Sequence, residues 1–150
     1  MSHVTIRAAG EDDIPTILLL WQDAGVTPPS VTDSVEGLTL LMREPTALLL
    51  VSIIDGQIAG SVIGGWDGWR GNIYRLAVAP AYRRKGIARR LVQEISRALF
   101  AKGAQRLSAL VEHEHPWAIE FWNSVSDLGY QRDPQFVRYI ADRKDSTEKR

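Results

Sequence analysis

Short apolar runs, some alternating with polar residues, recur along the chain and predict the strands of a sheet. Between the second and third runs lies an Asp55-Gly56 pair, which is typical of a two-residue hairpin turn. Leu107, Ala109 and Val111 later form a buried-strand pattern. The predicted strands are, in chain order, 4–6, 48–54, 57–63, 73–78 and 107–111.

Elsewhere the apolar residues recur every three or four positions, which predicts helices. The clearest case is the stripe Ile87, Leu91, Ile95 and Leu99, and Gly103 is placed to end that helix. Trp21 shares the helical spacing of the first helix, so we expect it in the core. The predicted helices are 14–21, 33–43, 87–99 and 117–125, the second and fourth with approximate ends.

This order of elements predicts an α/β chain of the α+β type with one mixed sheet. Three consecutive strands in the middle favour antiparallel pairing, whereas the helix between the fourth and fifth strands favours a parallel crossover there. Tyr130 and the apolar stretch 136–140 predict a closing pair of strands. The length of 150 residues suits a single domain at 1–142, followed by a charged, disordered tail at 143–150.

Composition then narrows the function. The formal net charge is zero, which argues against a nucleic acid or a membrane surface as partner. There is no cysteine, so a disulfide scaffold, a thiolate metal site and a cysteine nucleophile are excluded, and we expect no metal. Neither a signal-like start nor a membrane-length apolar run is evident, which favours a cytoplasmic location. A homodimer is left open.

The densest basic segment begins at Arg83 and leads into the third predicted helix. Backbone N–H groups at a helix start lack intrahelical partners, and the helix dipole favours an anion there. Gly86 has no Cβ to obstruct a ligand, and Ala88 keeps the first turn clear. The alternative is a solvated basic surface, but the position directly after a strand favours a phosphate site.

The segment resembles the coenzyme A loop of the GNAT superfamily of N-acetyltransferases. The similarity is carried by Leu76-Ala77-Val78-x-Pro80-x-Tyr82-Arg83-Arg84-Lys85-Gly86-Ile87-Ala88-x-x-Leu91 and extends to Ala118-x-x-Phe121-Trp122 before Gly129-Tyr130. More narrowly, Gly64-Gly65-Trp66-Asp67-Gly68-x-Arg70-Gly71 is similar to a bacterial subgroup of small, single-domain acetyltransferases with poorly defined acceptors. The resemblance implies a GNAT fold in which the fourth and fifth strands splay apart.

The resemblance also implies that acetyl-CoA is the cosubstrate and lies in that splay. Its pantetheine arm would pair with the backbone of the fourth strand, and its phosphates would meet backbone N–H groups and basic side chains of the loop. One N–H of the fourth strand would polarise the thioester carbonyl. The implied cofactor residues are Leu76, Ala77, Val78, Arg83, Arg84, Lys85, Gly86, Ile87, Ala88, Arg89 and Trp122.

The general acid and base are less clearly marked. Trp122 stands where much of the resembling family has a tyrosine that acts as the general acid. An indole N–H does not act as an acid at neutral pH. Asn72 stands at the position of a common glutamate base. The remaining candidates are Glu112, Tyr74 and His115, together with His113 and Asp67, and each has a structural alternative as a strand end, packing residue, helix cap or turn residue.

Acceptor recognition is predicted at a turn rich in aromatic residues. Trp66, Asp67 and Trp69 offer ring faces and a carboxylate to a cationic amine, although hairpin geometry alone also explains Asp67-Gly68. Pro28 lies in a loop that commonly forms a wall of the acceptor site in the resembling family. The acceptor would be a primary amine of a small molecule, a peptide or a protein.

Two other functions remain as alternatives. One is a sensor or scaffold of the same fold that binds coenzyme A with little or no transfer, which Trp122 and Asn72 favour. The other is a structural protein whose basic helix start binds a different anion.

Overall fold

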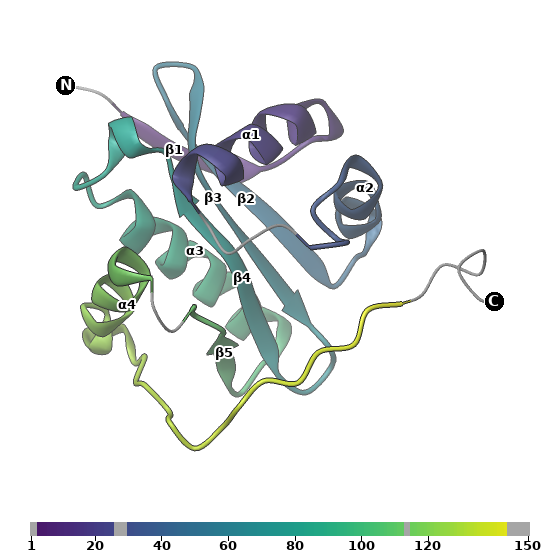
Figure 1. Ribbon diagram of the computed structural model, residues 1–150, viewed down its shortest axis with the longest axis vertical. Helices are drawn as coiled ribbons and strands as arrows, with labels where there is room; N and C mark the ends of the chain where they lie inside the picture. The colour runs from purple at the N-terminus through teal and green to yellow at the C-terminus, as the bar shows by residue number, and fades with distance from the viewer. Residues whose placement is uncertain (1–2, 26–29, 113–114, 144–150) are drawn as a thin grey trace.

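The computed structural model describes residues 3–25, 30–112 and 115–143, and its centre is a five-stranded sheet (Figure 1). The strands lie in the order β1-β2-β3-β4-β5, so each neighbours the next in the chain. All neighbours are antiparallel except β4 and β5, which are parallel as predicted. The strands are β1 (Val4–Ala8), β2 (Ala47–Ile54), β3 (Gln57–Trp66), β4 (Gly71–Val78) and β5 (Leu107–Ala109).

Helices cover both faces of this sheet. The first two pack against one apolar cluster, and the third packs against the other with the fourth beside it (Figure 1). No helix in the part of the chain that the structure describes is long and apolar enough to cross a membrane. The helices are α1 (Ile14–Ala24), α2 (Val35–Arg43), α3 (Ile87–Lys102) and α4 (Pro116–Asn123), with short 3-10 turns η1 (Glu11–Asp13), η2 (Pro80–Tyr82) and η3 (Ser126–Leu128).

The predicted apolar stripe of α3 forms the centre of one core. Its four side chains, Ile87, Leu91, Ile95 and Leu99, are each at most 2% exposed. Burying each one contributes about 1.5–3 kcal/mol relative to leaving it in water. The helix begins after a glycine at φ +77° and ends at Gly103, with φ +118°. This packing fixes the position of the helix start relative to β4.

The structure confirms the predicted hairpin between β2 and β3 and the predicted burial of Trp21. Asp55 (φ +51°) and Gly56 (φ +77°) are both left-handed, as the two-residue turn between β2 and β3 requires. Trp21 is 4% exposed and packs with α1, α2 and the inner face of the sheet.

Several element ends differ from the prediction. The second helix begins at Val35 rather than Asp33, because the Ser34 hydroxyl caps it by accepting the N–H of Gly37 at 3.0 Å. The fourth helix ends at Asn123, before Val125, and β5 is shorter than the run 107–111.

The predicted closing strands are wrong. Residues 131–143 contain no helix or strand, and the segment leaves α4 and runs past the β5 side of the sheet (Figure 1). Its β-forming side chains are exposed to solvent: Phe136, Val137, Tyr139 and Ile140. A strand needs a hydrogen-bonding neighbour, and the apolar pattern of a segment does not supply one.

Candidate cofactor and acceptor site

The site is built around the divergence of β4 from β5. The two strands pair only through Gly71–Leu107, Asn72–Ser108 and Ile73–Ala109. Beyond Ile73, β4 continues to Val78 without β5 beside it. We call this divergence the splay, and it is the feature that the fold prediction placed between the fourth and fifth strands. The implied pantetheine partners Leu76, Ala77 and Val78 all lie on this part of β4.

A bulge in β4 lies at the opening of the splay. Ser61 pairs with Ala77 and Ile63 with Tyr74, so Arg75 and Leu76 together oppose the single residue Val62. Arg75 has φ +51°, a left-handed conformation that costs a non-glycine residue about 1–2 kcal/mol.

The bulge turns one peptide group relative to the regular ladder. The carbonyl oxygen of Arg75 accepts the Ser61 hydroxyl of β3 at 3.3 Å. A trans peptide carries its C=O and the following N–H on opposite sides. The N–H of Leu76 therefore points away from β3, toward the splay, where it is placed to donate to a ligand.

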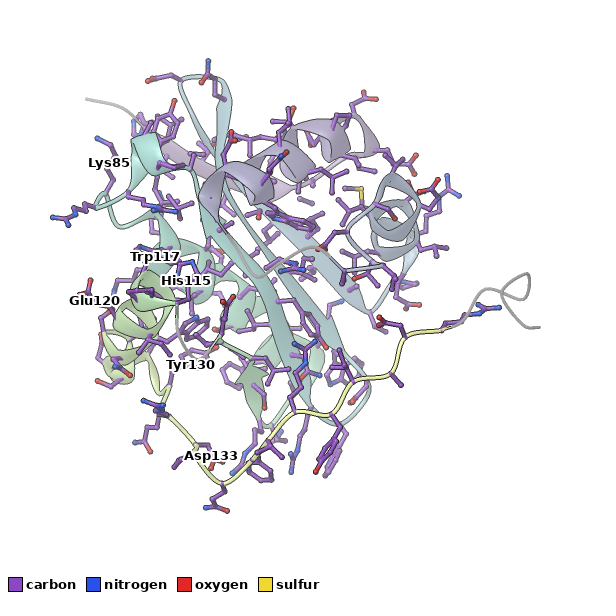
Figure 2. All side chains as sticks on the ribbon, viewed as in Figure 1. Lys85, His115, Trp117, Glu120, Tyr130 and Asp133 are labelled. Atoms are coloured by element: carbon purple, nitrogen blue, oxygen red, sulfur yellow. The ribbon has the colours of Figure 1, made fainter. Side chains whose placement is uncertain are left out.

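The predicted phosphate loop follows β4 directly. After η2 the chain passes through Arg84 (φ +65°) and Gly86 (φ +77°), two left-handed residues on either side of Lys85. Such alternation turns successive backbone N–H groups toward one side, and the N-terminus of α3 adds its unpaired donors. A Cβ on Gly86 would meet no atom within 4 Å, so its surroundings are open to a ligand. Lys85 points away from the body of the molecule (Figure 2).

The loop residues therefore differ in what they present. Arg84, Lys85 and Gly86 are exposed, whereas the Ile87 and Ala88 side chains are buried against the sheet and leave only their backbone at the loop. These residues fit an anionic group such as a pyrophosphate.

The other two basic residues of the predicted cofactor set, Arg83 and Arg89, have protein partners. Arg83 donates to the carbonyl oxygens of Ala24 (2.8 Å) and Val78 (3.3 Å), and its guanidinium carbon lies 5.4 Å from the centre of the Trp117 ring. Arg89 pairs with Asp127, which follows α4, and this contact lowers the pKa of that carboxyl. Arg83 therefore joins the end of α1 to the end of β4.

His115 makes a second connection to the end of α1. Its Nδ1 accepts the N–H of Ala118 at 3.3 Å and thereby caps α4. Its Nε2 lies 2.9 Å from the Gly25 carbonyl oxygen, which can only accept, so the proton is on Nε2. His115 and Trp117 lie side by side at the start of α4 (Figure 2). Both ring nitrogens are thus occupied in this arrangement.

The other candidate acids and bases lie at different depths. Tyr74, directly before the bulge, is 47% exposed. Glu112 is exposed after β5, and its carbonyl accepts the N–H of His115 at 3.2 Å. Trp122 is part of an aromatic cluster, with ring centres 5.4 Å from Phe121 and 5.1 Å from Tyr130. His113 lies outside the described residues.

The predicted acceptor residues lie at the other end of β4. The Asp67 Oδ1 accepts the N–H groups of Trp69 and Arg70, both at 2.9 Å, and these bonds, that of Arg70 foremost, lower the pKa of the Asp67 carboxyl. The Arg70 guanidinium lies 4.3 Å from the centre of the Trp69 ring, so a cation of the chain itself already occupies that face. Trp66, whose ring is partly buried, pairs with Gly71 at the start of β4.

This turn is far from the bulge. Gly71 and Leu76 are separated by about 17 Å, at about 3.3 Å per strand residue. The turn thus lies well away from the Leu76 N–H, and a small molecule beside that N–H would not reach it. Pro28, the remaining predicted acceptor residue, lies outside the described residues.

Sequence reasoning missed Arg75 and Trp117. The signal for Arg75 was a charged residue within the apolar run 73–78, but its left-handed backbone depends on the register between β3 and β4. Trp117 follows Pro116 at the start of α4, and only its contact with Arg83 places it beside the loop.

Comparison with known proteins gives similarity at two levels. A family model described as the acetyltransferase (GNAT) family matches residues 16–126. An acetyltransferase of Yersinia pestis (strain Pestoides F) is 32% identical over 120 residues, which cover 80% of this chain and 84% of the relative.

Solved structures share the fold at lower identity. The PaiA N-acetyltransferase from Thermoplasma acidophilum, solved in complex with coenzyme A, has a TM-score of 0.74 at 17% identity and covers 82% of this chain and 88% of its own. The aminoglycoside N-acetyltransferase AAC(6′)-Iy, solved with the bisubstrate analogue CoA-S-monomethyl-acetylneamine, has a TM-score of 0.73 at 15% identity and covers 93% and 99%. At these identities the likeness is one of fold.

Proposed function

The chain belongs to the acetyltransferase (GNAT) family of acyl-CoA-dependent enzymes, and we propose that it transfers the acetyl group of acetyl-CoA directly to a primary amine. The observation that carries the proposal is the edge of β4 beyond Ile73, where β5 no longer pairs with it. At one end of this edge the Leu76 N–H points toward the splay, and at the other end the chain enters the phosphate loop.

The residues of the splay fit acetyl-CoA in order along the chain. Backbone groups of Leu76, Ala77 and Val78 bind the pantetheine arm as a neighbouring strand would, because β5 pairs with β4 only as far as Ile73. Backbone N–H groups from Arg84 to Ala88 bind the pyrophosphate, and the exposed Arg84 and Lys85 add positive charge.

The cosubstrate supplies an acetyl thioester, and the chain stabilises the charge that develops when the amine attacks it. The Leu76 N–H donates to the thioester oxygen as negative charge develops there. Losing such a donor typically lowers kcat by about 10²–10³-fold. A C–N bond forms as the C–S bond breaks, the amine loses a proton, and the leaving thiolate gains one.

We assign the proton transfers to Glu112 or Tyr74, directly or through water. Glu112 follows β5 and Tyr74 precedes the bulge, so the two lie on opposite arms of the splay. The hydrogen bonds of His115 support a structural role for that residue, since both ring nitrogens are engaged.

The acceptor is a primary amine of a small molecule, a peptide or a protein. The complex of the neighbour AAC(6′)-Iy with an acetylneamine analogue supports including aminoglycosides among the amines tested. Pro28 and the turn at Trp66, Asp67 and Trp69 remain the proposed acceptor contacts, the turn for an acceptor long enough to reach from the splay.

Release of free thiol from acetyl-CoA, measured against polyamines, aminoglycosides and peptide N-termini, tests the proposal. We expect thiol release that depends on one class of amine. Thermal unfolding is measured in parallel, because acetyl-CoA at about 100 times its Kd stabilises the protein by about 2.7 kcal/mol. Stabilisation without thiol release for any amine would favour the sensor. The absence of both stabilisation and thiol release would exclude acetyl-CoA as the ligand.

A further inference from the structure

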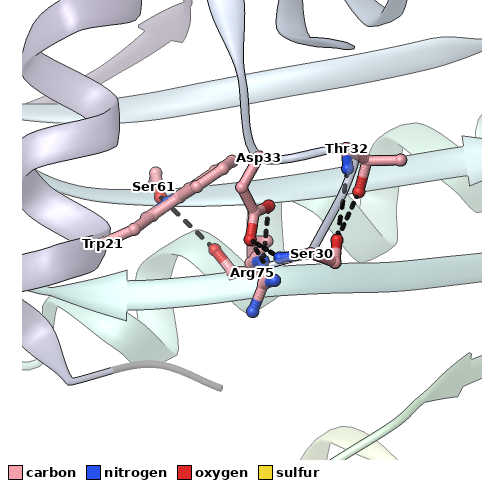
Figure 3. A network of polar contacts seen from close by, with 6 residues as sticks. All are labelled: Trp21, Ser30, Thr32, Asp33, Ser61 and Arg75. Carbon is pink, nitrogen blue, oxygen red and sulfur yellow. Dashed lines mark hydrogen bonds and ion pairs between the residues drawn. The ribbon is translucent and has the colours of Figure 1, made fainter. Parts of the chain in front are cut away.

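A chain of hydrogen bonds reaches the bulge from α1, which packs on one face of the sheet (Figure 3). Ser61 on β3 is fully buried, and its hydroxyl accepts the indole N–H of Trp21 at 2.8 Å. The same hydroxyl donates to the Arg75 carbonyl oxygen at 3.3 Å. It thus links a core residue of α1 to the peptide that carries the Leu76 N–H.

The side chain of Arg75 is held as well as its carbonyl. Its Nε and Nη2 lie 3.2 Å and 2.5 Å from the two carboxylate oxygens of Asp33. The two side chains are only 15% and 10% exposed, and the guanidinium lies 5.6 Å from the centre of the Trp21 ring. Asp33 itself accepts the N–H of Ser30 at 3.0 Å, so the segment before α2 is attached to the bulge (Figure 3).

These contacts act on the one residue of β4 with a left-handed backbone. A non-glycine residue keeps that conformation only where its surroundings hold it. We propose that Ser61, supported by Trp21, and Asp33 are positioning residues that lock the Arg75–Leu76 peptide with its N–H toward the splay. The inference rests on the proposed function, in which that N–H binds the thioester oxygen.

A second serine provides a matched control. Ser52 on β2 is also fully buried, but its hydroxyl has no hydrogen-bond partner among the described residues. Removing the hydroxyl of Ser52 therefore releases no peptide, whereas removing that of Ser61 takes a hydrogen bond from the Arg75 carbonyl and another from the Trp21 N–H.

The first experiment compares Ser61→Ala with Ser52→Ala under conditions where thermal unfolding shows both variants folded. We expect Ser61→Ala to lower kcat by about tenfold or more, as a misdirected oxyanion donor should. The KM for acetyl-CoA should stay near that of the wild type, and Ser52→Ala should keep both constants. Equal kcat values for the two variants would overturn the proposal.

A second readout needs no turnover. The amide resonance of Leu76 should shift, and its hydrogen exchange should accelerate, in Ser61→Ala but not in Ser52→Ala. An unchanged Leu76 amide overturns the lock even if the wild type proves inactive. Absence of thiol release by the wild type, with the Leu76 amide responding as expected, would instead overturn the proposed function alone.

The pair Arg75→Gly and Arg75→Ala separates the lock from a merely stabilising ion pair. Both variants lose the contact with Asp33, but glycine adopts the left-handed conformation without strain and alanine does not. We expect Arg75→Gly to retain a higher kcat than Arg75→Ala. Equal losses in both would show that the contacts of the Arg75 side chain, rather than its backbone conformation, are what matters, and would overturn the lock.

Discussion

Gly86 in the phosphate loop offers a test with an internal standard elsewhere in the chain. Gly86 and Gly56 share φ +77°, and a Cβ on either would meet no atom within 4 Å. Replacing each by glutamate therefore imposes the same backbone strain, of about 1–2 kcal/mol. Only Gly86→Glu places a carboxylate where we expect the pyrophosphate.

The two effects have different magnitudes and different readouts. The strain lowers Tm by about 2–4 °C per kcal/mol in a chain of this length, and it does so in both variants. A carboxylate at about 5 Å from a phosphate charge is repelled by about 3 kcal/mol at an effective dielectric constant of about 20. That repulsion weakens acetyl-CoA binding by about a hundredfold or more in Gly86→Glu alone.

Isothermal titration with acetyl-CoA measures the affinity, and thermal unfolding without ligand measures the strain. Wild-type affinity in Gly86→Glu would refute the assignment of this loop to the phosphates. An equal loss of affinity in Gly56→Glu would show that the strain, and not the site, is responsible.

Three further predictions concern two glycines of β3, the buried hydroxyl of Tyr130 and the indole of Trp122. Gly64→Ala puts a Cβ 2.6 Å from Ile95, so urea unfolding should show a loss of about 1–3 kcal/mol, whereas Gly65→Ala, with open space around its Cβ, should show none. Burial raises the pKa of the Tyr130 hydroxyl, so its contribution to stability is present below about pH 10 and is lost as the pH rises further. Tyr130→Phe should weaken that alkaline loss in urea unfolding at pH 9 and 11. Trp122→Phe should keep kcat near the wild-type value in the thiol assay, because an indole supplies no proton.

Each of these outcomes has a clear opposite. Equal stability of the two glycine variants would mean that Ile95 moves aside without cost. An unchanged alkaline loss in Tyr130→Phe would assign that loss to other groups. A large fall in kcat for Trp122→Phe would give the indole N–H a direct role in binding or orientation.

Local patterns were enough for most of the helices and strands, and they also carry the prediction of the phosphate loop. The apolar stripe of α3, the hairpin at Asp55-Gly56 and the loop at Arg83–Ala88 are each written within a few consecutive residues. Their physics is local, because helix periodicity, left-handed turn residues and unpaired N–H groups at a helix start need no distant partner. The same information predicted the parallel pairing of the fourth and fifth strands, since a helix joins them. The splay between them was implied by the resemblance to the GNAT superfamily.

The tertiary structure decided everything that depends on register and on distant contacts. The strand pattern at 136–140 failed because a strand requires a neighbour, and no local rule names one. The bulge arises from a one-residue offset between β3 and β4, which no property of Arg75 by itself reveals. The contacts of Ser61 with Trp21 and Arg75 join residues 40 and 14 positions apart. The sequence by itself therefore predicts where acetyl-CoA should bind. The folded chain decides which peptide we propose to face its thioester, because that orientation depends on side chains brought together only in the core.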